Sequence, residues 1–150
     1  MSVEGHTRKQ VQMHAVARNI TQQFVSKAPP QFKDTFAYGK VFYSSLDGRP
    51  VTVEEYVPGD FVKYVNNDGQ CLEAPSEEYD VAFGKAECLV HFSYNYSNKK
   101  MMLLDIQGSM FNLYDPEIAT AELNDELDDS GEFYFCAGNL SCLSISKFNR

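Results

Sequence analysis

Two aspartates and a glutamine lie near one another in the sequence, where a turn between strands could gather them. Asp105 follows the apolar run Met101–Leu104, Gln107 comes two residues later, and Asp115 comes ten residues after Asp105. Carboxylate and amide oxygens are ligands that Mg²⁺ accepts, and a carboxylate can take the proton of a substrate hydroxyl during phosphoryl transfer. Aspartates at strand ends more commonly cap turns. Spacing by itself therefore leaves both interpretations open.

The histidines and cysteines give a weaker signal for a zinc site. The four cysteines form no Cys-x-x-Cys pair, although close pairing is usual in structural zinc sites. We expect each to be a reduced thiol that packs as a small buried apolar side chain. His91 lies in the β-rich stretch Cys88–Tyr94, where a lone histidine is normally a half-buried imidazole with a hydrogen-bond partner. The cysteines are Cys71, Cys88, Cys136 and Cys142.

The elements that must position these groups begin with a helix predicted over Lys9–Ser26. Apolar residues recur there at spacings of three and four, which gives one apolar stripe. Ala28-Pro29-Pro30 ends the helix, because proline has no backbone N–H to donate. The stripe consists of Met13, Val16 or Ala17, Ile20 and Phe24.

Several strands are predicted after this helix. Phe36–Tyr43 and Val51–Val57 are β-rich, and the turn residues Ser45–Gly48 between them indicate a hairpin. Phe61–Val65 is a further short strand, and Asn66–Gly69 is a strong turn signal. This part of the chain therefore reads as antiparallel β-structure.

The second half is also predicted to be rich in strands. Beyond Cys88–Tyr94, Met101–Leu104 and Met110–Leu113 read as strands with a turn at Gln107-Gly108. Two helices complete the prediction, a short one around Glu117–Leu123 and a last one over Leu140–Phe148. An early helix, hairpin-linked strands and late helices predict an α+β fold.

The composition is that of one globular domain. The chain has 150 residues, of which 43% are hydrophobic and 13% aromatic, and this excludes a wholly disordered chain. No apolar run approaches the ~20 residues of a membrane span, and the polar N-terminus has no signal-peptide core. We therefore expect a cytoplasmic protein with no membrane partner.

The charge is concentrated in one segment. The net charge is −8, and residues 115–132 hold eight acidic residues and no basic one, so that the rest of the chain is neutral. Without a basic stripe, nucleic acid is not an expected partner. An acidic run is typical of a solvated loop. As a contact surface it would instead favour a basic partner or peptide substrate.

Four segments along the chain match motifs that occur together in one known family of proteins. Residues 53–64 (VEEYVPGDFVKY), followed by Asn67 and Gly69, resemble the stretch VE-x-Y-I-x-G-x-F-x-K-Y-N-x-N-x-G. Residues 90–94 (VHFSY) resemble S-H-F-T-Y. Residues 104–108 (LDIQG) and 113–118 (LYDPEI) resemble DLQG and LTDPQI at the family's spacing, and residues 135–141 (FCAGNLS) resemble FGxGNLG. The matches occur in family order and cover roughly residues 11 to 148, so the chain resembles the alpha-type protein kinases, the family of myosin heavy chain kinase and the elongation-factor kinase.

The resemblance implies that residues 1–150 are part of an alpha-type kinase catalytic domain with a two-lobed, largely antiparallel α+β fold. ATP would lie between the lobes, with Mg²⁺, and a serine or threonine of a protein would receive the phosphoryl group. The oligomeric state and the substrate protein are left open.

The resemblance also implies roles for individual residues. Asp105 and Asp115 match the two active-site aspartates, one for the metal and one near the substrate hydroxyl, with the assignment open. His91 matches a ligand of a structural Zn²⁺. The other implied positions are Lys63 as an active-site lysine, Glu54 as an adenine contact, Gln107 as a Mg²⁺ ligand, and Gly138 and Asn139 in the glycine motif.

The sequence departs from the family pattern in several places. Nothing before Val11 matches the family's phosphate-covering loop and its lysine, and the remaining zinc ligands would follow Arg150. Cys136 and Ser141 replace glycines, so this loop is expected to differ in shape. Tyr114 replaces a threonine. A second replacement, Val65 for an asparagine, follows Lys63-Tyr64.

Three interpretations follow. The chain is an alpha-type kinase domain, or a kinase-like module that binds nucleotide or a partner without turnover, or an unrelated α+β interaction domain. The four ordered matches favour the family, and the unmatched lysine and zinc ligands predict little turnover by these 150 residues alone. An unpaired edge at Phe36–Tyr43 and Val51–Val57 predicts self-association.

Overall fold

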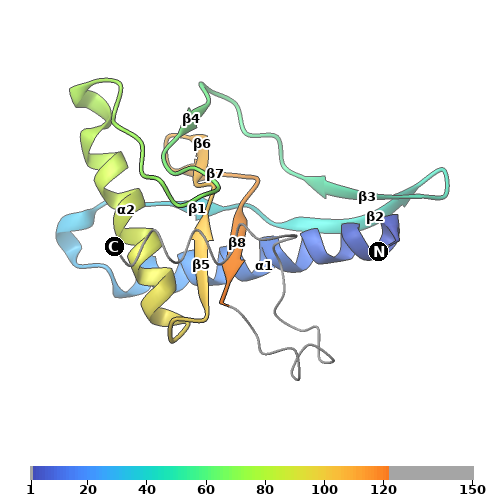
Figure 1. The fold of residues 1–150 in the computed structure, drawn as a ribbon. Helices are drawn as coiled ribbons and strands as arrows, with labels where there is room; N and C mark the ends of the chain where they lie inside the picture. The colour runs from blue at the N-terminus through green and yellow to red at the C-terminus, as the bar shows by residue number, and fades with distance from the viewer. Residues whose placement is uncertain (1, 122–150) are drawn as a thin grey trace.

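Two long helices and three small sheets make up residues 2–121, which are the residues that the computed structural model describes (Figure 1). All pairings but one between neighbouring strands are antiparallel, so the predicted α+β class with largely antiparallel strands is confirmed. Two short 3₁₀ turns, Pro30–Phe32 and Glu77–Tyr79, lie in the connections. Neither helix within the described range combines the length and the hydropathy that crossing a bilayer requires.

Helix α1 spans Val3–Lys27 and begins earlier than the predicted Lys9. Ser2 caps its N-terminus, because the hydroxyl oxygen accepts a hydrogen bond from the Gly5 N–H at 3.0 Å. The helix ends at the predicted Ala28-Pro29-Pro30 sequence. The predicted apolar stripe is confirmed: its buried members are Met13, Ala17, Ile20 and Phe24.

A β-hairpin lies along the N-terminal half of α1 (Figure 1). It is formed by β2 (Val41–Leu46) and β3 (Arg49–Glu54), so the predicted hairpin is confirmed, although its strands were predicted over Phe36–Tyr43 and Val51–Val57. Asp47 and Gly48 form the two-residue turn with φ of 51° and 76°, a conformation that suits the twist of a hairpin and favours Asp-Gly. The Arg8 guanidinium of α1 lies 4.3 Å from the ring centroid of Tyr43 and ties the hairpin to the helix.

The central sheet has four strands in the order β1, β7, β6, β4. Strand β1 (Ala37–Tyr38) runs parallel to β7 (Asn112–Leu113), and β6 (Gln107–Ser109) pairs antiparallel with both β7 and β4 (Val62–Lys63). The β4–β6 register places Lys63 directly opposite Gln107. The topology thereby brings together residues that are 44 positions apart in the sequence.

The predicted turn at Gln107-Gly108 is wrong, because both residues lie in β6 and the turn falls at the next two positions after Ser109. The glycine has a different purpose. A Cβ at position 108 would lie 2.1 Å from the Asn112 carbonyl oxygen, so strand β7 approaches the backbone too closely for any side chain. The close approach of strand β7 therefore explains the glycine at position 108, and a reversal of the chain does not.

Helix α2 spans Asp80–Tyr96, which corrects the strand predicted over Cys88–Tyr94. Its β-branched and aromatic residues favour a strand locally, but burial follows a helical period. Buried Ser93 connects the helix to β5 (Met101–Leu104), since its hydroxyl donates to the Val90 carbonyl at 2.7 Å and accepts from the Leu103 N–H at 2.9 Å. The buried positions are Ala82, Ala86, Leu89, Val90 and Ser93.

Strand β8 (Glu117–Thr120) pairs antiparallel with β5, with Leu103 opposite Ile118. The helix predicted around Glu117–Leu123 is therefore wrong over these four residues, because pairing with a buried strand overrides the helix propensity of Glu and Ala. Leu123 and the helix predicted over Leu140–Phe148 lie outside the described residues.

The core lies between the helices and the sheets, and aromatic side chains join its parts. The buried ring of Tyr64 packs against Phe36 and Phe83 at centroid distances of 5.4 and 4.8 Å. Its hydroxyl donates to the Met110 carbonyl at 2.8 Å. This bond fixes the turn between β6 and β7 to the strand that carries Lys63.

Cys71 and Cys88 are exposed, so the prediction of buried thiols is wrong for both of them. Cys88 lies on the outer face of α2, one position before the buried Leu89. Cys71 lies beside the tight turn at Asn66–Gly69, where its backbone pairs with that of Val65. Cys136 and Cys142 lie outside the described residues.

Candidate active site

Lys63 and Asp105 form an ion pair at the end of the central sheet. Lys63 Nζ lies 2.7 Å from Asp105 Oδ1, and the two side chains are 33% and 21% exposed. Asp105 follows β5 directly and has a φ of 51°, a left-handed conformation that aspartate tolerates better than most residues. Its N–H donates to the Asn66 carbonyl at 3.3 Å. Both partners are therefore held by the backbone elements that carry them.

Gln107 links the two predicted aspartates. Gln107 is 9% exposed. Its Nε2 amide donates to Asp105 Oδ2 at 3.4 Å and to the Asp115 backbone carbonyl at 3.1 Å. Both amide hydrogens are thus used, and the side-chain oxygen is left as the atom that could ligate a cation.

Asp115 faces a second group that comes from other elements. Ligand atoms of His14 on α1, Glu54 at the end of β3, and Asp115 after β7 all lie within 4.8 Å of one another. Asp115 has a φ of 49°, the same left-handed conformation as Asp105. His14 is half-buried, whereas the two acidic residues are exposed. Nothing in the sequence singles out His14 beyond its position next to Met13 in the buried stripe.

The charges of this second group influence one another. Burial raises the pKa of Glu54 above its ordinary value, and the neighbouring Asp115 carboxylate raises the same pKa further. Burial lowers the pKa of His14, and the Asp115 charge opposes part of that decrease. His14 is therefore mainly neutral near pH 7, beside two carboxylates.

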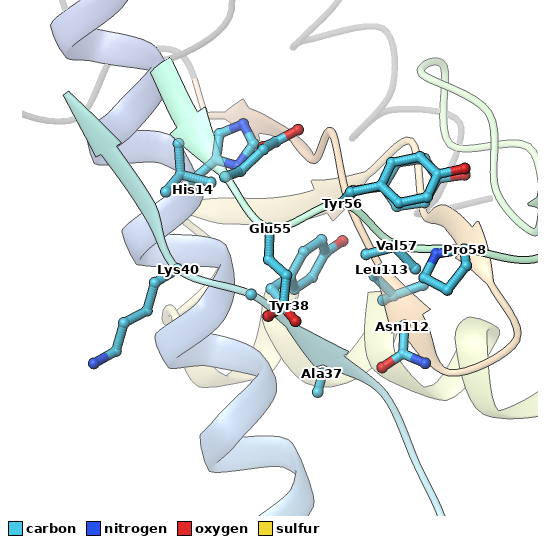
Figure 2. A pocket seen from close by; sticks show the side chains of 14 residues that line it. His14, Ala37, Tyr38, Lys40, Glu55, Tyr56, Val57, Pro58, Asn112 and Leu113 are labelled. Atoms are coloured by element: carbon cyan, nitrogen blue, oxygen red, sulfur yellow. The ribbon is translucent and has the colours of Figure 1, made fainter. Parts of the chain in front are cut away.

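A hollow of about 330 Å³ opens between α1, β1 and the segment that follows β3 (Figure 2). Glu55 and Tyr38 lie within it, Tyr56 and Leu113 flank it, and the Lys40 side chain points away from it. His14 and Glu54 line this hollow and also an adjoining one of about 320 Å³, which Asp115 borders. The site therefore consists of a cleft whose one end carries the carboxylates.

Tyr38 places an unpaired hydroxyl beneath the cleft. The residue is 6% exposed, and its Oη has no hydrogen-bond partner among residues 2–121. Burial raises the pKa of the Tyr38 phenol, and the Asp105 charge raises it further, so the hydroxyl stays protonated. A buried donor without a partner is unusual and favours a bound molecule or water at this point.

Some of the predicted site residues are in contact in the structure, and others lie apart from them or outside the described residues. Lys63, Asp105 and Gln107 are in direct contact, and Gln107 connects them to Asp115 and thereby to Glu54. His91 lies apart, on the exposed face of α2, and no cluster of metal-ligating side chains surrounds it in the described part of the chain. Gly138 and Asn139 lie outside the described residues.

Comparison with known proteins identifies the class to which this fold and site correspond. The family model described as the alpha-kinase family matches residues 2–148. The chain therefore belongs to the alpha-kinase family, as its sequence resemblance predicted, and its α+β fold is the alpha-kinase fold.

Two curated relatives match most of this chain. It is 32% identical to myosin heavy chain kinase A of Dictyostelium discoideum over 145 residues, which cover 92% of this chain and 11% of that protein. It is 28% identical to human transient receptor potential cation channel subfamily M member 6 over 144 residues, which cover 93% and 7% of the two chains. The chain thus spans a small part of the length of these relatives.

Solved structures of the alpha-kinase domain of myosin heavy chain kinase A share the fold. The complex with ADP superposes with a TM-score of 0.70 at 27% identity and covers 99% of this chain and 55% of that one. An inactive variant in complex with ATP gives a TM-score of 0.68 at 27% identity, with 99% and 56% covered. The chain spans about half the length of these domains.

Proposed function

We propose that this protein is a serine/threonine protein kinase of the alpha type that uses ATP and Mg²⁺. The observation that carries the proposal is the linked set of Lys63, Asp105, Gln107 and Asp115 in a chain of this family. Phosphoryl transfer depends mainly on positioning and on charge stabilisation, and this set supplies a cation, two carboxylates and an amide in fixed geometry.

The cleft beside Glu54 is the proposed nucleotide site. Myosin heavy chain kinase A has been solved with ADP, AMP, AMP-PNP and ATP, the last in an inactive variant. In this chain Glu54, Glu55 and Tyr56 line a hollow of about 330 Å³, which suits a group of the size of a purine. The phosphates would then lie toward Asp115, which borders the adjoining hollow.

The oxygen atoms around Gln107 fit a magnesium ion. The Gln107 side-chain oxygen and the Asp105 carboxylate are oxygen donors of the kind that hard cations prefer. When bound, Mg²⁺ would neutralise charge on the transferred phosphate. Among residues 2–121, His91 belongs to no group of three or more metal-ligating side chains, so the structural Zn²⁺ stays a prediction from the resemblance.

The two aspartates are proposed to differ in role. Both Asp105 oxygens are engaged, one with the Lys63 ammonium and one with the Gln107 amide, which suits a fixed carboxylate that orients the site. Asp115 is exposed at the open end of the cleft, where the hydroxyl of a protein substrate could approach its carboxylate. We assign the substrate-facing role to Asp115.

Transfer of labelled phosphate from Mg·ATP to a basic protein tests the proposal. Any transfer should be lost in Asp105→Ala and in Asp115→Asn and should keep its level in Asp60→Asn, which changes another exposed aspartate. Equal transfer by Asp105→Ala would contradict the assigned site. The expectation of little turnover by these 150 residues alone stays a prediction, which the same assay tests.

Thermal unfolding separates binding from transfer. Mg·ATP at about a hundred times its Kd stabilises by ~2.7 kcal/mol, which corresponds to a rise in Tm of about 5–10 °C for a chain of this size. A rise without transfer would favour the nucleotide-binding module without turnover. A chain that unfolds cooperatively and shows no rise would overturn the nucleotide site.

A further inference from the structure

Three side chains from three separate elements converge at the open end of the cleft. They are His14 in the middle of α1, Glu54 as the last residue of β3, and Asp115 after β7, and their ligand atoms lie within 4.8 Å of one another. Nitrogen and oxygen donors around a metal are typically about 2.0–2.2 Å from it, so two donors of one ion lie no more than about 4.4 Å apart. Small side-chain rotations of the exposed acidic residues would bring the group within that limit.

We propose that His14, Glu54 and Asp115 form a binding site for a borderline divalent cation of the Zn²⁺ type. The donor set is one imidazole nitrogen and two carboxylate oxygens. Three protein ligands with an open fourth position are the arrangement of an accessible zinc site, whereas magnesium favours oxygen donors and keeps several waters.

The site differs in position from the magnesium ligands. Asp105 follows β5 and Gln107 begins β6, and the Gln107 amide donates to the backbone carbonyl of Asp115, not to its carboxylate. The carboxylate is directed toward His14 and Glu54 instead. Asp115 thus contacts Gln107 through its backbone carbonyl, and it belongs to the group with His14 and Glu54 through its carboxylate.

The electrostatics of the group favour a bound cation. Two carboxylates lie beside one another, and a cation placed between them would offset their mutual repulsion. The His14 imidazole adds a nitrogen donor to the two carboxylates, and a metal-binding imidazole nitrogen must be unprotonated. The adjoining hollow of about 320 Å³ leaves room for water molecules as the remaining ligands.

Occupation of this site would interfere with the nucleotide. This consequence rests on the proposed function, because Glu54 is assigned to the adenine and Asp115 to the substrate hydroxyl. A bound borderline cation would hold both side chains, so it would compete with Mg·ATP, and Mg·ATP would weaken the metal by the same factor. The metal site itself does not depend on the kinase assignment.

Direct metal binding to the chain, freed of metal by a chelator and free of nucleotide, tests the site. We expect one Zn²⁺ by calorimetry, and Co²⁺ with the visible absorption of a low-coordinate nitrogen and oxygen site. His14→Gln should weaken the affinity about tenfold or more, since even residues that only contact the ligands change metal affinity by about 10–100-fold. The matched control is His6→Gln, which removes an exposed histidine of the same helix and hollow and should leave the affinity unchanged.

Each outcome decides one part of the proposal. Affinity that is unchanged in His14→Gln, or lost equally in His6→Gln, would overturn the site, as would the absence of saturable Zn²⁺ binding to the folded chain. If Zn²⁺ binds but Mg·ATP does not, the metal site stands and the proposed kinase function fails.

Discussion

The ammonium of Lys63 lies 2.7 Å from Oδ1 of Asp105, and the partner strand of Lys63 carries Gln107, whose amide contacts the other oxygen of the same carboxylate. One aspartate is thus held from two sides by side chains of neighbouring strands. Asp105 itself has left-handed backbone geometry, which aims its carboxylate at this pair. The arrangement fixes the position of a charged group without burying it completely.

Removal of either partner of this ion pair should destabilise the chain. Lys63→Met and Asp105→Asn should each lower the free energy of unfolding by about 1.5–3 kcal/mol, because each leaves a partly buried charge without its partner. Denaturant unfolding measures this, and the double variant gives the coupling energy. The control pair is Arg8 with Glu4, which is 58% and 60% exposed and should couple by no more than about 0.5 kcal/mol. Equal coupling in the two pairs would contradict the interpretation.

Gln107→Glu should make stability depend on a divalent cation. The substitution replaces an amide donor beside Asp105 with a third carboxylate. The free energy of unfolding, measured with a chelator present, should therefore fall by about 1–3 kcal/mol. Added Mg²⁺ should recover much of that loss, since the cation screens the new charge. Unfolding curves with and without Mg²⁺ measure the effect. Gln70→Glu, at an exposed turn position, is the matched control, and an identical response there would argue against a cation beside Gln107.

Tyr38→Phe should leave the ligand-free chain as stable as before, or more stable by up to about 1 kcal/mol. The reason is that it removes a buried hydroxyl that has no hydrogen-bond partner among residues 2–121. If a nucleotide pairs with this hydroxyl, the rise in Tm that Mg·ATP produces should be smaller in Tyr38→Phe. Thermal unfolding of both chains with and without Mg·ATP measures the two effects. A marked loss of stability without ligand would show that the hydroxyl has a partner in the folded chain.

The thiol of Cys71 should react slowly at neutral pH although it is exposed. Partial burial raises its pKa above the ordinary 9.0, and the Glu87 carboxylate raises it further. A raised pKa for an acid means that the thiolate, which is the reactive form, appears only at higher pH. Alkylation followed at this site by peptide mass spectrometry should therefore reach half its maximal rate above pH 9.0.

Glu87→Gln should move that alkylation profile toward lower pH, because it removes a negative charge that opposes ionisation. Glu73→Gln is the control, a charge change of the same kind near Cys71 in the sequence. A profile that stays in place in Glu87→Gln would mean that burial accounts for the whole pKa increase.

The outer face of the β2–β3 hairpin should mediate self-association. Phe42 and Val53 lie directly opposite one another in the register and are 60% and 50% exposed, and Leu46 at the hairpin end is 65% exposed. Contiguous apolar side chains on a two-stranded sheet favour association with another copy. Phe42→Lys should lower the apparent mass in sedimentation at high concentration. Val25→Lys, which adds the same charge at an exposed position of α1, should not, and equal effects would point to net charge as the cause.

The sequence by itself determined the helix over α1, the β2–β3 hairpin, the order of the family motifs and the residues that carry charge at the site. These features depend on local rules, namely the period of the Met13–Phe24 stripe, the proline stop after Ala28 and the Asp-Gly turn. They could be predicted because neighbouring residues decide them.

Tertiary structure decided the rest. Local propensity favoured a strand at Cys88–Tyr94 and a helix at Glu117–Leu123, but α2 packs on β5, and β5 pairs with β8. His14 becomes part of a group of metal-ligating side chains only with Glu54 and Asp115, which approach it after the chain has folded. The contact of Lys63 with Asp105 likewise needs the β4–β6 pairing. A sequence pattern shows which face of a helix or strand is apolar. It does not show which element packs against that face, because that contact forms between segments that are distant in the sequence and depends on the fold of the whole chain.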